Sequence, residues 1–196
     1  MRLESFDSIV INLDSRPERW DEVQEELPKI GITDFKRFPG ILDGNAGFSR
    51  SHLACVDGDG FRFVFEDDVI FEPDALEILN KAIDQLPEDF DMFYLGGNVK
   101  TSAERYSENL YHIRGGVHTT HAILFSGKAR KFIVGHYNPG SHNLIDEWYY
   151  REGLNQMNCY ICYPMIAFQR GSYSDLRLQY FDYREEMLEN AKNNMK

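Results

Sequence analysis

The sequence predicts a single α/β domain built on a mixed, mostly parallel sheet with helices on its flanks. Apolar runs typical of buried strands, such as 8–13 and 61–65, alternate with stretches of helical periodicity through the first 95 residues. This alternation is typical of parallel strands joined by helical crossovers. A length of 196 residues suits one domain. We therefore expect one domain over 1–196, with its core at 8–176 and a closing helix at about 182–194.

The first helix has clear boundaries in the sequence. Ser15 and Glu18 have the spacing of a capping box and Gly31 provides a stop, so a helix is predicted over about 16–30. The other elements follow from the same kinds of signal. Further strands are predicted at 35–38, 91–96, 109–113 and 120–126, and the stretch 158–169 is expected to be extended. Further helices are predicted at 73–86, 127–136 and 145–153.

The segment 39–47 is rich in glycine and predicts a loop, and a helix is expected to begin near Phe48 or Ser49. That helix carries Ser51 beside His52, a pair that suggests a nucleophile and its base. Sequence neighbours on a helix point in different directions, however, so such a pair seldom forms. A helix cap and a core histidine are the plain alternative for these two residues.

Composition excludes several classes of partner. The chain is 42% hydrophobic and 27% charged, as expected of a globular protein, and its net charge is −11. Surfaces that follow nucleic-acid phosphates or anionic lipids need an excess of Lys and Arg, which this chain lacks. No apolar run approaches the about 18 residues of a membrane span, and the N-terminal stretch does not read as a signal peptide. We expect no nucleic-acid partner, no membrane span, and a cytoplasmic protein of bacterial or viral origin.

The three cysteines fit a reduced compartment. Cys159 and Cys162 form a CxxC pair, which suggests either a redox pair or half of a zinc site. A tetrahedral zinc site needs a second pair of ligands, and the sequence has no second CxxC. Because the surrounding NCYICYP is apolar and β-rich, a buried strand is the better interpretation.

The strongest functional signal is the segment FVFEDDVIFEPD at 63–74, where Glu66, Asp67 and Asp68 interrupt an apolar run. Ligands of open α/β sheets bind beyond the carboxyl ends of the strands, and these acids lie at such an end. Adjacent carboxylates repel one another, and a divalent cation such as Mg²⁺ or Mn²⁺ relieves the repulsion while it binds a phosphorylated ligand. The alternative is that they are solvated acids, or a cap for the helix that starts near Pro73.

Several segments together resemble glycosyltransferase family 25, the lipooligosaccharide and collagen galactosyltransferase type. The similar segments lie in the family's order and cover about residues 8–176: VINLDSRPERW, GFSRSHL, FVFEDDVIF, HAILFSGKARKFI and PMIAFQRGSYSDL. The chain departs from the family at Phe48, where a cysteine is common, and in its short length.

The resemblance implies a GT-A fold, which is a Rossmann-like nucleotide-sugar domain whose acidic motif binds Mn²⁺. It also implies a UDP-sugar donor, usually UDP-galactose, a glycan or glycoprotein acceptor, and inversion at the anomeric carbon. In such enzymes the bound metal offsets the charge that builds on the leaving diphosphate. The resemblance assigns the metal to Asp68, and the ribose or donor sugar to Glu66 and Asp67.

The same resemblance assigns Ser51 and His52 to the donor pocket. The nucleoside and diphosphate are assigned to the end of the first strand and the next helix, at Asn12, Leu13, Asp14, Arg16 and Arg19. The alternative for the two arginines is that they pair with Glu18 or Glu22 on the helix surface.

Inversion needs a base on the acceptor hydroxyl group. Asp146 is the candidate base, since it lies among apolar and aromatic residues and the family tends to have Asp here. Glu147 is the alternative base. Asp146 could also be a structural carboxylate at the start of a helix, with no catalytic role. Further metal or phosphate ligands are sought in the C-terminal part, at His142, Gln169 or Asp175.

Two other functions stay open. The short chain suggests a degenerate transferase domain that binds a nucleotide sugar or a partner without turnover. A third hypothesis is a metal-dependent phosphohydrolase that uses the same acids.

Overall fold

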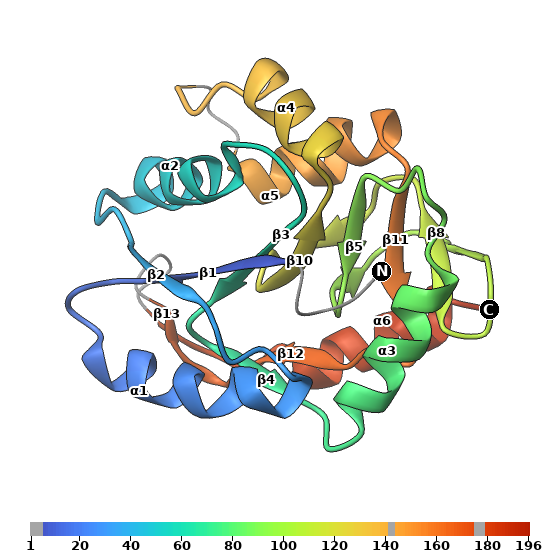
Figure 1. The fold of residues 1–196 in the computed structure, drawn as a ribbon, viewed down its shortest axis with the longest axis horizontal. Coiled ribbons are helices and arrows are strands. Elements are labelled where there is room, and N and C mark those ends of the chain that lie inside the picture. Colours follow the sequence, from blue (N-terminus) through green and yellow to red (C-terminus); the bar gives the residue numbers. More distant parts are fainter. Residues whose placement is uncertain (1–5, 141–143, 175–178) are drawn as a thin grey trace.

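The computed structural model describes residues 6–140, 144–174 and 179–196, which form an α/β domain around a central sheet (Figure 1). The strands of this sheet are β1 (Asp7–Asn12), β2 (Lys36–Pro39), β3 (Arg62–Glu66), β5 (Met92–Tyr94), β7 (Glu104–Arg105), β8 (Leu110–Ile113), β10 (Ala122–Phe125) and β11 (Cys159–Cys162). Within the described residues their order is β2-β1-β3-β10-β5-β11-β8-β7. β10 and β8 run against the other strands, so the sheet is mixed and mostly parallel, as the sequence predicts.

Helices cover both faces of this sheet. They are α1 (Pro17–Glu26), α2 (Gly44–Val56), α3 (Ala75–Gln85), α4 (Gly127–His136), α5 (Ile145–Trp148) and α6 (Arg184–Asn194), with shorter turns at Leu27–Ile30, Tyr149–Gly153 and Leu154–Gln156. α1 and α3 lie on one side, and α2, α4 and α5 on the other (Figure 1). Along β3, Phe63 and Phe65 enter the core under α1 and α3, whereas Val64 enters the opposite core. Burial on both faces explains why β3 is a continuous apolar run.

Short strands outside the central sheet pair antiparallel. They are β4 (Val69–Phe71) with β12 (Ala167–Gln169), β6 (Asn98–Val99) with β9 (Val117–His118), and β13 (Ser172–Ser174) with β14 (Gln179–Phe181). The β4–β12 pair brings the residues that follow β12 beside the turn at Asp67 and Asp68. Within the described ranges, no helix has the length and apolar character that crossing a membrane requires.

Two predictions about helix starts are wrong. Ser15 and Glu18 do not form a capping box: α1 is capped at Arg16 without a side-chain capping bond, and the Glu18 carboxylate instead accepts a bond from Arg16 Nε at 2.6 Å. α2 begins at Gly44 rather than near Phe48, so part of the predicted loop is helical. At Gly47 a Cβ atom would lie 2.1 Å from the Ile41 carbonyl oxygen, so glycine is needed there for close packing and not for flexibility.

The position of β10 decides what surrounds the acidic end of β3. β10 lies antiparallel to β3, with Ala122 opposite Phe65, and the Glu66 N–H donates to the His121 carbonyl at 3.0 Å. The residues that precede β10 therefore reach the end at which β1 and β3 finish. This edge is where the parallel β1–β3 pair meets an antiparallel neighbour.

A buried arginine ties the loop before β3 to α4. Arg130 is fully buried, and its guanidinium group donates to the carbonyl oxygens of Val56 (2.7 Å), Asp57 (2.5 Å) and Gly60 (3.1 Å), and also to that of Asp59. These carbonyls lie at the end of α2 and in the following turn, so one side chain satisfies groups that the helix leaves unpaired.

Arg130→Met is expected to lower the free energy of unfolding by about 3 kcal/mol, because it leaves the buried Val56 carbonyl and three partly buried carbonyl groups without this donor. Urea titration of both proteins measures the difference. Lys131→Met is the matched control: its ammonium group is exposed and pairs with Asp59, so a change below about 1 kcal/mol is expected. Equal losses in the two variants would contradict this role for Arg130.

Candidate functional site

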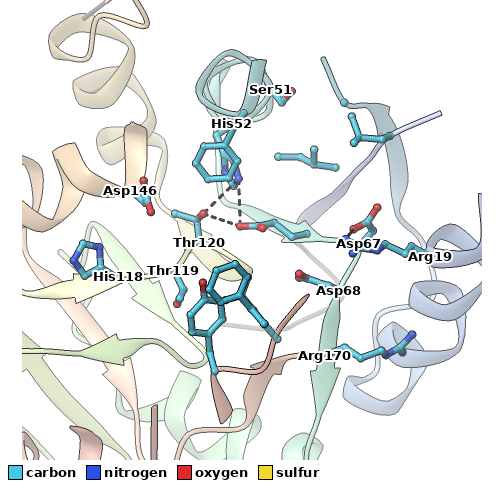
Figure 2. A pocket seen from close by; sticks show the side chains of 18 of the residues that line it. Arg19, Ser51, His52, Asp67, Asp68, His118, Thr119, Thr120, Asp146 and Arg170 are labelled. Carbon is cyan, nitrogen blue, oxygen red and sulfur yellow. Dashed lines mark hydrogen bonds and ion pairs between the residues drawn. The ribbon is translucent and has the colours of Figure 1, made fainter. Parts of the chain in front are cut away.

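A cavity of about 440 Å³ opens where β1 and β3 end and β10 begins. The helix α2 with the loop before it, the helices α5 and α6, β6, and the stretches around the ends of β12 and β14 complete its walls. Figure 2 shows His118, Thr119, Thr120 and Asp146 on one side of it, facing Asp67, Asp68 and Arg19 on the other. Its apolar end is formed by Ile11, Leu13, Ile41, Leu42 and Phe48.

The three acids do not cap the following helix. Glu66 is the last residue of β3, Asp67 and Asp68 form a turn, and β4 then intervenes before α3. Asp74 precedes α3 and makes no side-chain capping bond. All three acids line the cavity instead.

Asp67 is held by two polar side chains. Asn12 Nδ2 donates to one carboxylate oxygen at 2.6 Å, and Arg19 Nη1 lies 3.3 Å from the other. Asn12 also donates to the Arg16 carbonyl at 2.9 Å and accepts a bond from Arg37 Nε at 2.8 Å. Burial raises the pKa of Asp67, although these contacts oppose the rise.

Glu66 is held on the opposite side of the motif. Thr120 Oγ1 donates to its Oε1 atom at 2.7 Å, and His52 Nε2 lies 3.4 Å from both Oε1 and Thr120 Oγ1 (Figure 2). Burial pushes the pKa of Glu66 upward, but the contacts with His52 and Thr120 outweigh burial and hold the pKa below its usual value. Glu66 is therefore a partly buried, charged group whose carboxylate is oriented by Thr120 and His52.

Asp68 keeps an oxygen without a partner. Its Oδ1 atom is covered from solvent and has no hydrogen-bond partner among the described residues. Burial, followed by the charges of Glu66 and Asp67, raises the pKa of Asp68 to about 8. A buried carboxylate beside two other carboxylates is a position that a divalent cation would stabilise.

The donor set fits a cation that is held partly by its ligand. No cluster of three His, Cys, Asp or Glu side chains in the described residues is arranged to hold a metal. Mg²⁺ and Mn²⁺ are commonly bound through one or two carboxylates, with phosphate and water oxygens in the other positions. Asp68 fits that single-carboxylate arrangement.

Positive charge gathers near the acids. Arg16 and Arg19, the predicted donor-binding arginines, line the cavity, and so do Arg170 and Lys100, which sequence reasoning missed. The Arg170 guanidinium group pairs with Glu22 and lies 3.8 Å from Glu26. Arg16 pairs with Glu18, as the alternative interpretation holds, whereas Arg19 contacts Asp67 rather than the helix surface. The Arg170 backbone N–H donates to the Asp68 carbonyl at 2.7 Å, so Arg170 is joined to the acidic turn.

Ser51 and His52 line the cavity but make separate contacts. Ser51 Oγ donates to the Gly47 carbonyl at 2.8 Å and accepts a bond from the Ile41 N–H at 2.8 Å, so it fixes the loop that forms the cavity mouth. The ring of His52 points instead toward Glu66. They do not form a nucleophile–base pair.

Asp146 and Glu147 are separated by the turn of α5. Asp146 lines the cavity, where burial raises the pKa of its carboxyl group despite the 2.8 Å bond from the Glu147 N–H. The Glu147 carboxylate pairs with Arg151 and lies 3.9 Å from His118 Nδ1, outside the cavity lining. Of the two candidate bases, Asp146 is the one that faces the acidic motif.

The remaining predicted residues have mixed positions. Leu13 lines the apolar end, and Gln169 lines the cavity near Arg170. Asn12 is buried behind Asp67, and Asp14 is exposed and pairs with Arg37 at 2.7 Å, so neither lines the cavity. His142 and Asp175 lie outside the described residues.

The residues that sequence reasoning missed come from the stretch before β10, from β6 and the residues after it, and from the C-terminal part. His118, Thr119 and Thr120 line the cavity because β10 is antiparallel to β3, and a local pattern does not reveal such a pairing. Two consecutive threonines before an apolar strand are the only local signal, and it is a weak one.

The CxxC pair is structural. Cys159 and Cys162 lie on β11 and enter opposite cores of the sheet, so they cannot meet. Burial raises the pKa of both thiols far above the usual value, which makes them unreactive. The buried-strand interpretation is confirmed.

No protein-family model matches this chain, and no curated protein matches it in sequence. Solved structures share its fold. A UDP-glucose pyrophosphorylase matches with a TM-score of 0.51, both as the apo form (10% identity) and complexed with UDP-glucose (12% identity), over 95% of this chain and 80% of that chain. A glycosyltransferase involved in the glycosylation of the major capsid of PBCV-1 matches with a TM-score of 0.50 and 10% identity, over 97% of this chain and 100% of that one. The expected Rossmann-like α/β fold is thereby confirmed.

The Asp68 pKa gives a stability prediction for metal-free protein. In the unfolded chain Asp68 ionises near its model-peptide pKa of 3.8, whereas in the fold it stays protonated up to about pH 8. Its contribution to the free energy of unfolding is therefore lost as pH rises from about 4 to about 8. The Asp68→Asn protein has no carboxyl group to ionise at this position, so its stability does not fall in this way. At pH 9 in EDTA its melting temperature should exceed that of the wild type by roughly 3 °C or more, the shift that about 1 kcal/mol produces.

Thermal melts at pH 5 and pH 9 measure this effect as the difference between the two proteins. Asp14→Asn, a substitution of an exposed acid, is the control and should show no pH-dependent gain. An Asp68→Asn protein that is less stable than wild type at pH 9 would contradict the electrostatic account of Asp68.

Proposed function

We propose that this protein is a metal-dependent inverting glycosyltransferase that transfers a hexose, galactose by the family 25 resemblance, from a UDP-sugar to a glycan or glycoprotein. The observation that carries the proposal is the unpartnered Asp68 oxygen, facing Asp146 across a cavity at the carboxyl ends of β1 and β3. This edge of an α/β sheet is the usual ligand site. A protein of the same fold, the UDP-glucose pyrophosphorylase, is known in complex with UDP-glucose, which supports a UDP-sugar here.

The cavity offers suitable groups for each part of such a donor. Leu13, Ile41 and Leu42 give an apolar surface for the uracil ring. Glu66 and Asp67 offer carboxylates to the hydroxyl groups of the ribose or of the sugar. Arg16 and Arg19 place positive charge for the diphosphate. Asn12 acts through Asp67, which it orients.

Asp68 would hold Mn²⁺ or Mg²⁺. A bound ion of this kind supplies Lewis-acid stabilisation of the charge that develops on the leaving diphosphate. Asp68 is suited to this role because it lies in the turn beside Glu66 and Asp67 and has an oxygen that no described residue uses.

Asp146 is the proposed general base. In an inverting displacement the acceptor oxygen bonds to the anomeric carbon, the bond from that carbon to the phosphate oxygen breaks, and the acceptor proton passes to Asp146. The buried position that raises the pKa of Asp146 also makes its carboxylate a stronger base.

Asp68→Asn tests the metal role. We expect Mn²⁺-dependent transfer or hydrolysis of UDP-galactose to fall by at least roughly 100-fold, the usual scale for loss of one electrostatic stabiliser. Release of UDP is the measurement, with and without EDTA. A binding module would show no turnover even in the wild type, and a phosphohydrolase would release product at the same rate whether or not an acceptor is added.

Asp146→Asn separates catalysis from binding. The variant should keep the wild-type affinity for the donor but lose roughly 100-fold or more in transfer rate, since it retains the shape of Asp146 and loses the base. Glu147→Gln is the matched control and should change the rate less than about threefold. Equal effects of the two substitutions, or a loss of donor affinity in Asp146→Asn, would exclude this role.

A further inference from the structure

Thr119 has an unusual backbone conformation. Among the described residues it is the one non-glycine residue with a positive φ, at 79°. A β-branched residue is rarely found in this region, because its side chain crowds the backbone there. Strain of this kind persists only where the surrounding structure enforces it, and it gathers at binding and catalytic sites.

The positive φ of Thr119 changes which side chains line the cavity. In a regular strand consecutive side chains alternate between opposite faces. Here His118, Thr119 and Thr120 follow one another and all line the cavity, between the end of β9 and the start of β10. The left-handed turn at Thr119 breaks the alternation, and Figure 2 shows the three side chains beside Asp146, on the wall opposite Arg19 and Arg170.

The hydroxyl group of Thr119 has no partner among the residues that the structure describes. Its Oγ1 atom is covered from solvent and makes no hydrogen bond with any described residue. Burying a hydroxyl group without a bond costs stability, as does the strained backbone. Rotation about the Cα–Cβ bond exchanges the hydroxyl and methyl positions, and it can turn the hydroxyl toward the cavity that Thr119 lines.

We infer that Thr119 is a specificity-determining residue whose hydroxyl group bonds a hydroxyl group of the transferred sugar. This inference rests on the proposed function. The ligand part concerned is the sugar rather than the diphosphate, because Thr119 lies on the Asp146 wall, away from the arginines on the opposite wall. The neighbouring Thr120 hydroxyl is already used by Glu66, so Thr119 is the threonine available to the ligand.

The test compares Thr119→Val and Thr119→Ser by calorimetric titration with UDP, UDP-galactose and UDP-glucose in Mn²⁺. Valine keeps the branched shape and removes only the hydroxyl group, whereas serine retains it. Thr119→Val should bind the preferred UDP-sugar roughly five- to tenfold more weakly, as expected for one lost hydrogen bond, with its affinity for UDP changed less than about twofold. Thr119→Ser should bind nearly as wild type does.

Two controls exclude a general disturbance. The melting temperature of Thr119→Val should equal or exceed that of the wild type, because the variant buries no unpaired hydroxyl. Ser107→Ala removes another covered hydroxyl without a partner, at a position outside the cavity lining, and should leave all three affinities unchanged.

The outcomes separate this inference from the proposed function. If wild type binds a UDP-sugar and Thr119→Val binds it equally well, the inference is overturned and the proposed function stands. Equal losses for UDP and the UDP-sugar, or a lowered melting temperature, would also overturn it, since they indicate a structural role. If wild type binds no UDP-sugar, the proposed function and this inference both fail.

Discussion

The structure of the site depends on how three adjacent carboxylates are accommodated at the end of a buried strand. Their mutual repulsion destabilises the turn, and two of the three carboxylates are compensated by side chains from other elements. β1 and α1 supply Asn12 and Arg19 to Asp67, whereas α2 and the stretch before β10 supply His52 and Thr120 to Glu66. Elements far apart in the sequence are thus fixed around one turn, and the charge of Asp68 is the one that keeps an unsatisfied oxygen.

The three acids of the motif therefore differ in how the protein holds them. Glu66 and Asp67 are oriented by protein groups, so they are rigid and pre-organised, and Asp68 is left to respond to a ligand. The raised pKa of Asp68 expresses the same imbalance, because burial and the charges of Glu66 and Asp67 destabilise its ionised form. Under the proposed function, the motif trades stability of the metal-free site for affinity, as binding sites commonly do.

Much of the fold could be predicted from the sequence, because β1, β3 and α3 have strong local periodicity and the acids interrupt a run that must be buried. The acidic motif, Arg19, His52 and Asp146 were also predicted as site residues, and they line one cavity. What could not be predicted depends on pairing. The antiparallel insertion of β10 brings Thr119 and Thr120 to the site, and the β4–β12 pair brings Arg170. The start of α2 was missed because Gly44 and Gly47 predict a loop, whereas the glycine at 47 allows a close approach.

The central claim is that the acidic turn holds a divalent cation together with a nucleotide sugar. Calorimetric titration of the wild-type protein with UDP-galactose, in Mn²⁺ and again in EDTA, tests it most directly. The account predicts binding in Mn²⁺ that weakens at least roughly tenfold in EDTA, since the metal then no longer offsets repulsion between the diphosphate and the acids. Binding of equal strength in both conditions, or no binding of UDP-galactose, UDP-glucose or GDP-mannose by the folded protein, would contradict it.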